Sequence, residues 1–580
     1  MKRCPECRRD YYDDSMLYCL DDGTALLEGP GNKSEPPSIR GGLTRFSTDD
    51  NEPATAILSG REPSLTPGTG PPAPDKGAEP QKYESHRPAT GTGRHKARMF
   101  ISILFVLALM MGGIAYYRYK RSAASERIAS IAVLPFENRS PADTDTEYLS
   151  EGLTDSLIFH FSQLPNLKVS PTSSVMRYKS TAKDIADIAK ELDVDAVLSG
   201  RLIQIGDDLS ISAQLIDART NKVVWAEQYD RKMADLLATQ QEIATALTQK
   251  MQLRLAGSEK NTNSNEAYQL YLKGRHQFRM HTQESLFRAI DLFHQALQID
   301  PGYARAYCGL ADCYGVLGNS YLPPNESFPQ AKSYAAKALA LDDSLGQAHA
   351  SMGAIKLYYD WDWAEAEKEL KRANELDPGR TEGFEVDGDL LETSGRLDEA
   401  LAERRRDLEL DPLSAVYNMT LGATLYFCRR PDEAIAQLEK AVEMEPHLAD
   451  NYQYLGEAYE QKGMYDKAIA TYEKGITQTQ RYPYLLAALG HAYATAGERE
   501  PALSVINELH ERSQKEYISP YLFAIVYLGL SDRDQTFIWL NKAFDDRSFF
   551  LLWLNVEPSF DTVRSDKRFT DLLRRIRHIQ

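Results

Sequence analysis

A repetition of 34 residues in the C-terminal half limits the fold of this chain more than any other feature of the sequence. Four glycines follow one another at this interval, and an alanine follows each glycine 12 residues later. The eight positions are Gly388, Gly422, Gly456, Gly490, Ala400, Ala434, Ala468 and Ala502. Small side chains let two helices cross closely. The spacing therefore predicts a stack of helical hairpins with one small residue in each helix.

The 34-residue period and its fixed small residues resemble the tetratricopeptide repeat (TPR) family. That resemblance implies an all-α, right-handed superhelical solenoid whose concave groove binds a protein or peptide partner. Less regular units precede Gly388 and one follows Gly490, so we expect about eight repeats within residues 266–580. Residues 566–579 form a basic amphipathic pattern at the end, which is typical of the polar-faced cap that a solenoid needs.

Residues 127–256 show a different pattern, which predicts an α/β or α+β domain. A β-branched run at 128–136 indicates a buried strand. Three further runs, at 195–205, 208–218 and 222–229, indicate strands joined by tight turns. Helical periodicity lies between the first strand and the other three, and it returns after the last strand.

Short segments of this domain resemble the TolB amino-terminal-like (FlgO-like) domain. They read SIAVLPF at 130–136, EYLSEGLT at 147–154 and WAEQYD at 225–230. The resemblance covers nearly the whole of residues 127–256. It implies an extracytoplasmic, non-catalytic module for interaction or sensing, and it assigns no role to any single residue.

The run MFISILFVLALMMGGIAYY at 99–117 contains no charged residue and has basic residues on both sides. A helix of about 20 such residues spans the hydrocarbon core of a bilayer, which is roughly 30 Å thick. We therefore expect one transmembrane helix at 99–117, through which the protein contacts the membrane. The preceding segment, 30–95, is rich in Gly, Pro, Ser and charge, and this composition predicts a disordered linker.

Residues 1–29 contain three cysteines in a pattern that resembles a small zinc ribbon. Two cysteines are separated by two residues, and a cysteine and an aspartate repeat this gap further on. The four predicted ligands are Cys4, Cys7, Cys19 and Asp22. Zinc accepts thiolate and carboxylate ligands, and a closed four-ligand site is structural. We expect one structural zinc ion, with Asp21 as the alternative fourth ligand and a tail of unliganded cysteines as the alternative to a metal site.

We expect a single-pass protein of the bacterial inner (cytoplasmic) membrane. The basic residues on the two sides of 99–117 roughly balance, so the positive-inside rule does not decide the orientation. Thiolates persist best in a reducing compartment, which favours a cytoplasmic N-terminus. Residues 120–580 are then extracytoplasmic, in agreement with the resemblance found for 127–256.

Charge and motif content argue against two classes of function. The net charge of -17 leaves little room for the basic face that nucleic-acid phosphates require, so no nucleic-acid partner is expected. The histidines of the repeat region are scattered, and no kinase signature or other catalytic spacing is present in the sequence. We therefore expect that the chain is not an enzyme, has no catalytic residue, and holds no cofactor besides the zinc ion.

Together these patterns predict a multidomain, membrane-anchored scaffold or sensor that binds partner proteins through its TPR repeats. The alternative is a transmembrane signalling receptor. Such a receptor would couple binding at the extracytoplasmic TolB-like and TPR domains to a contact made by the cytoplasmic zinc ribbon. Removal of the zinc-ribbon segment separates the two hypotheses, because a scaffold keeps its activity and a receptor loses its output.

Overall fold

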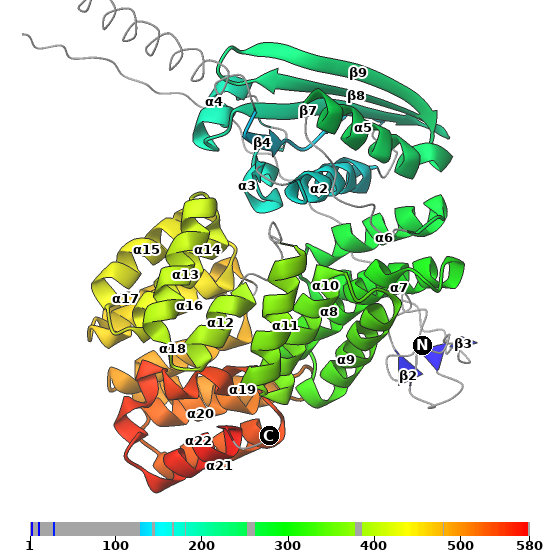
Figure 1. Cartoon of the computed structure of the whole chain (residues 1–580). Helices are drawn as coiled ribbons and strands as arrows, with labels where there is room; N and C mark the ends of the chain where they lie inside the picture. The colour runs from blue at the N-terminus through cyan, green and yellow to red at the C-terminus, as the bar shows by residue number, and fades with distance from the viewer. Residues whose placement is uncertain are drawn as a thin grey trace, which may run out of the picture. The chain divides into compact units, whose positions relative to one another are not determined.

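The computed structural model describes residues 128–141, 146–251, 262–377 and 385–577, without residues 165, 166, 180, 182 and 480 (Figure 1). It also describes three short strands near the N-terminus. The predicted linker at 30–95 and the predicted membrane helix at 99–117 lie outside these residues. Within the described part of the chain, no helix is both long and apolar enough to cross a membrane.

The three N-terminal strands form a small sheet in the order β2-β1-β3. They are β1 (Lys2–Arg3), β2 (Asp10–Tyr11) and β3 (Leu27–Glu28). Strands β1 and β2 are antiparallel, with Lys2 opposite Tyr11.

A second sheet forms the α/β region, in the order β6-β4-β7-β8-β9, with β5 paired to β7. The strands are β4 (Ser130–Val133), β5 (Glu137–Asn138), β6 (Lys168–Val169), β7 (Ala196–Ile205), β8 (Asp208–Asp217) and β9 (Lys222–Lys232). Strand β4 runs parallel to β6 and β7, whereas β7, β8 and β9 form an antiparallel meander. The four strands predicted from the sequence are thus confirmed.

Helices cover one face of this sheet (Figure 1). They include α2 (Glu147–Ser162) and α5 (Leu236–Lys250), and the shorter helices α3 (Thr172–Met176) and α4 (Ile185–Glu191) also belong to the region. Strand β8 alternates as predicted, because Leu209, Ile211, Ala213 and Leu215 are all buried. Alternate residues of a strand point to opposite faces, so these four side chains form the face that the helices cover.

Between Asn265 and Asp545 the described residues form eight helical hairpins that follow one another as antiparallel pairs (Figure 1). They are α6 (Asn265–Phe278) with α7 (Gln283–Ile299), α8 (Ala304–Ser320) with α9 (Pro324–Leu341), α10 (Gly346–Ile355) with α11 (Trp363–Leu376), α12 (Glu385–Thr393) with α13 (Leu397–Leu410), α14 (Ala415–Phe427) with α15 (Pro431–Met444), α16 (Ala449–Gln461) with α17 (Tyr465–Gln478), α18 (Pro483–Thr495) with α19 (Arg499–Arg512), and α20 (Pro520–Gly529) with α21 (Arg533–Asp545). A π-helical turn, η2 (Lys356–Asp360), extends α10. The predicted helical solenoid is confirmed.

The repeated glycines lie where the two helices of a hairpin touch. A Cβ atom on Gly422 would be 2.5 Å from Cγ of Leu438, and one on Gly456 would be 2.2 Å from Cε1 of Tyr472. Real Cβ atoms do not approach heavy atoms so closely. In these two hairpins the bulky side chain 16 residues after the glycine therefore packs directly on the glycine backbone, and at Gly490 the side chain of Val505, 15 residues later, makes this contact.

One hairpin departs from this packing rule. In the hairpin of α12 and α13 the residue 16 positions after Gly388 is Arg404, and it occupies the place taken by Leu438 in the next hairpin. The side chain of Arg404 is 1% exposed and contacts the carboxylates of Asp389 and Glu392. An ion network thus replaces an apolar contact inside this repeat.

The α/β region and the first hairpins share one hydrophobic core, which extends from Ile131 in β4 to Ile355 in α10. Helix α2 packs closely on α6, where a Cβ atom on Gly152 would be 2.8 Å from the side chain of Leu272. The hydroxyl of Tyr268 in α6 also donates a hydrogen bond of 2.5 Å to Gln240 in α5. The repeats therefore begin directly on the helical layer of the α/β region.

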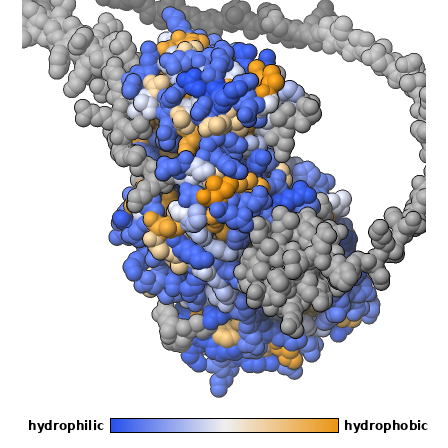
Figure 2. Space-filling view, turned by 90° about the vertical axis from the view of Figure 1, so that its right-hand side faces the viewer, coloured by the Kyte–Doolittle hydropathy of each residue, from blue (hydrophilic) through white to orange (hydrophobic). Residues whose placement is uncertain are grey.

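Among the described residues, few large apolar side chains are exposed. On the face drawn in Figure 2, hydrophilic residues predominate and the hydrophobic ones form small, separate patches. The exposed large apolar residues include Ile205 and Val223 of the sheet and Ile538 of α21. Single apolar residues are normal on a protein surface, so this distribution does not by itself mark a binding site.

Candidate functional site

The first helices of the later hairpins share a face on which the end of the chain lies. After α21 the chain forms two 3-10 segments, η3 (Phe549–Asn555) and η4 (Pro558–Val563), before the terminal helix α22 (Lys567–Arg577). The indole nitrogen of Trp553 donates a hydrogen bond of 2.9 Å to Glu392 of α12. The segment thus reaches from the last hairpin to the fourth.

Aromatic contacts hold the same segment against α18 and α20, and a hydrogen bond joins it to α14. The ring of Phe550 lies 4.9 Å from the ring of Tyr484 and 5.3 Å from that of Tyr521, measured between centroids. The hydroxyl of Tyr426 donates a hydrogen bond to Glu557. Part of the face that the TPR resemblance assigns to a partner peptide is therefore covered by residues 549–563 of the chain itself.

A cavity of about 280 Å³ remains on this face beside the segment. Four tyrosines and two glutamates line it together with polar residues of the last hairpins. The lining residues that carry the argument are Tyr426, Tyr465, Tyr472, Tyr484, Glu457, Glu460, Gln461, His491 and Thr495, and Pro558, Ser559 and Asp561 of η4 close one side. We name this space the inner-face cavity.

The charges at the inner-face cavity are mostly negative. Glu460 accepts hydrogen bonds from the hydroxyl of Tyr472 and from Nδ1 of His491, each at 2.8 Å. Burial alone would lower the pKa of His491, but the carboxylate of Glu460 outweighs burial and raises it. The carboxylate of Glu460 thus favours the protonated form of His491, whereas Glu457 accepts from the hydroxyl of Tyr484 at 3.0 Å.

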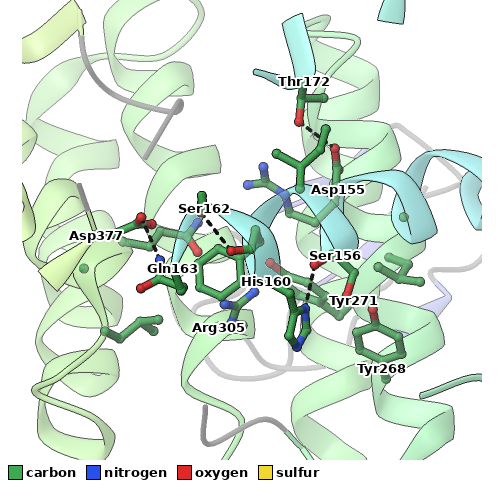
Figure 3. Close-up of a pocket in the computed structure, with 18 of the residues that line it drawn as sticks. Asp155, Ser156, His160, Ser162, Gln163, Thr172, Tyr268, Tyr271, Arg305 and Asp377 are labelled. Atoms are coloured by element: carbon green, nitrogen blue, oxygen red, sulfur yellow. Dashed lines mark hydrogen bonds between the residues drawn. The ribbon is translucent and has the colours of Figure 1, made fainter. Parts of the chain in front are cut away.

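A second cavity, of about 210 Å³, lies where α2 meets the first hairpins (Figure 3). The side-chain amide of Gln163 donates to Asp377 at 2.8 Å, and the hydroxyl of Thr172 donates to Asp155 at 3.1 Å. His160 is bonded through Nδ1 to the backbone oxygen of Ser156. These polar groups already satisfy one another, so the cavity is part of a polar seam between the α/β region and the repeats.

An ion cluster strengthens this seam beside the cavity. Glu151 of α2 accepts from Nδ1 of His276 at 2.6 Å and from Nζ of Lys179 at 2.8 Å. Burial would raise the pKa of Glu151, but the hydrogen bonds from these two residues outweigh it and lower the pKa to about 2. The ionised carboxylate thus favours the docked arrangement of α2 and α6.

Two family models match parts of the chain. Residues 126–246 match the model described as "HilA/YgeH-like transcriptional regulator, second domain", and residues 429–491 match a tetratricopeptide repeat model. The chain therefore contains TPR repeats, as the 34-residue period predicts. The comparisons give no support to the resemblance with the TolB amino-terminal-like domain.

Two kinds of curated relative align with the chain. "Putative adenylate cyclase 3" of Rhizobium meliloti (strain 1021) is 33% identical over 230 residues, which are 38% of this chain and 39% of the relative. "Transcriptional regulator HilA" of Salmonella typhimurium is 26% identical over 280 residues, which are 47% of this chain and 49% of the relative. The chain thus spans less than half the length of the curated relatives that it matches.

Solved structures with related helices have low TM-scores. The structure titled "Functional Characterization of Pseudomonas Aeruginosa pilF" has a TM-score of 0.29 and 20% identity, covering 37% of this chain and 94% of the other. The yeast Tom70 structure has a TM-score of 0.36 and 17% identity, covering 55% of this chain and 69% of the other. The assignment of the repeats therefore rests on the family model and on the hairpin geometry.

The expectation that the chain is not an enzyme is wrong as stated. A relative named as an adenylate cyclase contradicts it. The alignment covers 38% of the chain at 33% identity, so the name of that relative leaves the enzymatic nature of this chain open.

The predicted zinc ligands lie outside the described residues, as does the alternative ligand Asp21. Within the ranges that the structure describes, no three His, Cys, Asp or Glu side chains are placed to hold a metal ion. The sequence analysis named no residue of the groove, and the structure adds Glu457, Glu460 and Tyr484. Their signal in the sequence is weak: Glu457 and Glu460 are three residues apart, so they share one face of a helix.

Proposed function

We propose that the chain is a membrane-anchored scaffold or sensor that binds a partner protein through its TPR repeats. The observation that supports this most directly is the inner-face cavity, which is lined by helices of the TPR hairpins and remains beside the segment at 549–563. The partner in this proposal is a protein or peptide and not a nucleic acid, in keeping with the acidic net charge.

Co-purification of the full chain from its source cells tests this function. The tagged full chain in mild detergent is used as bait. The repeats alone, cut at about residue 260, are unsuitable because the face of α6 that packs on α2 would then be exposed. The informative variant is Thr495→Arg, which places a bulky cation at the cavity. The matched control is Thr477→Arg, at an exposed position of α17 that does not line it. The proposal predicts a partner that is recovered with the wild type and with Thr477→Arg but not with Thr495→Arg.

The second candidate function is a transmembrane receptor in which the α/β region and the repeats bind a signal and the N-terminal segment passes it on. The names of the aligned relatives, a putative cyclase and a transcriptional regulator, favour this alternative because both denote signalling or regulatory proteins. Deletion of residues 1–29 decides between the two functions. A scaffold without this segment still supports its cellular role, whereas a receptor still binds the partner and loses the downstream response.

The membrane helix at 99–117, the cytoplasmic N-terminus and the extracytoplasmic placement of 120–580 belong to this proposal. The uncharged run with basic residues on both sides supports the membrane helix. Protease treatment of intact spheroplasts tests the orientation. The proposal predicts digestion of the repeats in intact spheroplasts, and repeats that survive until the membrane is opened would contradict it.

The zinc site of Cys4, Cys7, Cys19 and Asp22 is also a proposal. The spacing of the cysteines supports it, because two thiolates separated by two residues can bind one zinc ion together. Metal analysis of a peptide of residues 1–30 should find one zinc ion, and less zinc when Cys7 is changed to serine. A peptide that retains no zinc would exclude the site.

A further inference from the structure

We propose that the inner-face cavity is a binding site for a primary ammonium group, such as the side chain of a lysine. The inference adds a ligand chemistry to the proposed function, and it can be tested without knowing the partner protein. The unpaired acceptors of the cavity, its acidic side chains and its tyrosine lining support this ligand chemistry.

Two buried acceptors at the cavity lack a donor. Atom Oε2 of Glu457 is buried without a well-formed hydrogen bond, although the side-chain amide of Gln453 lies near this carboxyl group. Atom Oε1 of Gln461 is likewise buried without a donor among the described residues. The amide nitrogen of Gln461 donates to the backbone oxygen of Tyr426 at 3.3 Å, which directs Oε1 away from that contact. The lining residues leave no buried donor unpaired. A ligand that completes the site must therefore donate hydrogen bonds, and an ammonium group has three donors and no acceptor.

The charge of the site favours a cation. Three glutamates gather here, and Glu460 is paired with His491. Glu457 accepts from the hydroxyl of Tyr484, and Glu557 accepts from the hydroxyl of Tyr426 and from the backbone of Ser559. None of these donors carries a positive charge, so neither carboxyl group gains a cationic partner from them.

The other cation at the cavity is already engaged. Among the described lining residues, Arg429 is the cation besides His491, and its guanidinium pairs with Asp561 at 2.8 Å. Arg429 also donates to the backbone oxygen of Val556 at 2.8 Å. Glu457 therefore lacks an ion-pair partner among the described residues of the cavity.

The surroundings of Glu457 make its charge costly in the absence of a ligand. Burial raises the pKa of Glu457 well above its ordinary value, and the nearby carboxylate of Glu557 raises it further. Burial likewise raises the pKa of Glu557. A cation between these groups would favour their ionised forms, so part of the binding free energy would come from the relief of this repulsion.

The lining distinguishes an organic cation from a metal ion. Within the described residues, the acidic and histidine side chains are not placed to hold a metal. Four tyrosine rings line the cavity, and aromatic rings attract ammonium groups through their π-electrons. A volume of about 280 Å³ also exceeds the space of a single dehydrated ion, and it can receive an alkyl chain with its ammonium head.

Isothermal titration calorimetry on the purified full chain tests the proposal. The probes are the blocked tripeptide acetyl-Ala-Lys-Ala-amide, the same peptide with norleucine in place of lysine, and n-butylammonium. The variant Glu457→Gln removes the charge and keeps an acceptor for Tyr484. The matched control is Glu439→Gln, because Glu439 also accepts from a tyrosine hydroxyl, at 2.9 Å from Tyr459, but does not line the cavity.

We expect saturable binding of the lysine peptide to the wild type and to Glu439→Gln, binding at least tenfold weaker to Glu457→Gln, and none for the norleucine peptide. Equal binding of n-butylammonium would assign the site to free amines, and binding of the lysine peptide alone would assign it to a protein segment. We also expect Glu457→Gln to raise the melting temperature of the unliganded chain, which shows that the variant folds. Absence of saturable amine binding, or unchanged binding by Glu457→Gln, would overturn the proposal. Amine binding that persists while no partner protein is recovered would instead count against the proposed function.

Discussion

The indole nitrogen of Trp553 donates a hydrogen bond to Oε2 of Glu392, a residue 161 positions earlier in the chain. The side chain of Glu392 is 3% exposed, and it also accepts from the hydroxyl of Thr424. This contact fixes the C-terminal segment to the fourth hairpin, so that the segment forms part of the inner face of the solenoid.

Replacement of Trp553 by phenylalanine should therefore destabilise the protein. The change keeps an aromatic ring but removes the donor to buried Glu392, and a buried acceptor that loses its partner costs about 1–3 kcal/mol. Urea unfolding of the purified chain measures the loss. The control is Trp539→Phe, because the ring of Trp539 stacks on Phe523 with centroids 4.2 Å apart and a phenyl ring can keep that stack. Equal losses in the two variants would contradict the role of the hydrogen bond.

Replacement of Arg404 by leucine should be strongly destabilising, although leucine is the residue at the equivalent place in the next hairpin. The change removes the buried cation and leaves the carboxylates of Asp389 and Glu392 without it. Breaking a buried ion pair from one side costs about 3–5 kcal/mol. The exposed neighbour Arg405 serves as the control, since its replacement by leucine should change the free energy of unfolding by less than about 0.5 kcal/mol. A stable Arg404→Leu variant would show that the ion network is dispensable.

Two glycine-to-alanine changes should have opposite effects. At Gly456 the new Cβ would lie 2.2 Å from the ring of Tyr472, and such overpacking costs about 1–3 kcal/mol. At Gly315, also inside a helix, no heavy atom lies within 4 Å of the new Cβ, so alanine should stabilise the helix by roughly 0.5–1 kcal/mol. Thermal unfolding of both variants tests the packing rule, which fails if the two changes shift the melting temperature in the same direction.

The ion cluster of Glu151 predicts a dependence of stability on pH. The pKa of Glu151 is lowered from 4.5 to about 2 on folding, so its contribution is complete above about pH 5 and is lost as the pH falls through 2. Relative to Glu151→Gln, the wild type should lose roughly 2–3 kcal/mol of stability between pH 5 and pH 2. Urea unfolding at several pH values measures this difference. The control Glu266→Gln, at an exposed position of α6, should show no comparable change.

Local patterns predicted the elements of the fold, because each depends on a short period in the sequence. The 34-residue step of Gly422 and Gly456 located the hairpins, and the alternation of Leu209 and Ile211 located β8 and its buried face. Such patterns report which face of an element is buried. They do not report which distant element covers that face.

The candidate site depends on contacts that no local pattern encodes. Residues 549–555 read FFLLWLN, an apolar run that signals burial, but the sequence does not show that Trp553 reaches Glu392. Likewise, the sequence around Glu457 is typical of a solvated residue of a helix. Only the structure shows that Glu557, 100 residues later in the chain, lies near it. The acidic inner-face cavity therefore became apparent only in three dimensions.

Site-specific photo-crosslinking in the source cells tests the central claim most directly, namely that a partner protein binds at the inner face of the repeats. A photoreactive amino acid replaces Thr495, which lines the inner-face cavity, or Thr477, which is exposed on α17 away from it. The account predicts one defined protein adduct from position 495 and none from position 477. Adducts from position 477 alone, or from neither position while the chain is functional, would contradict it.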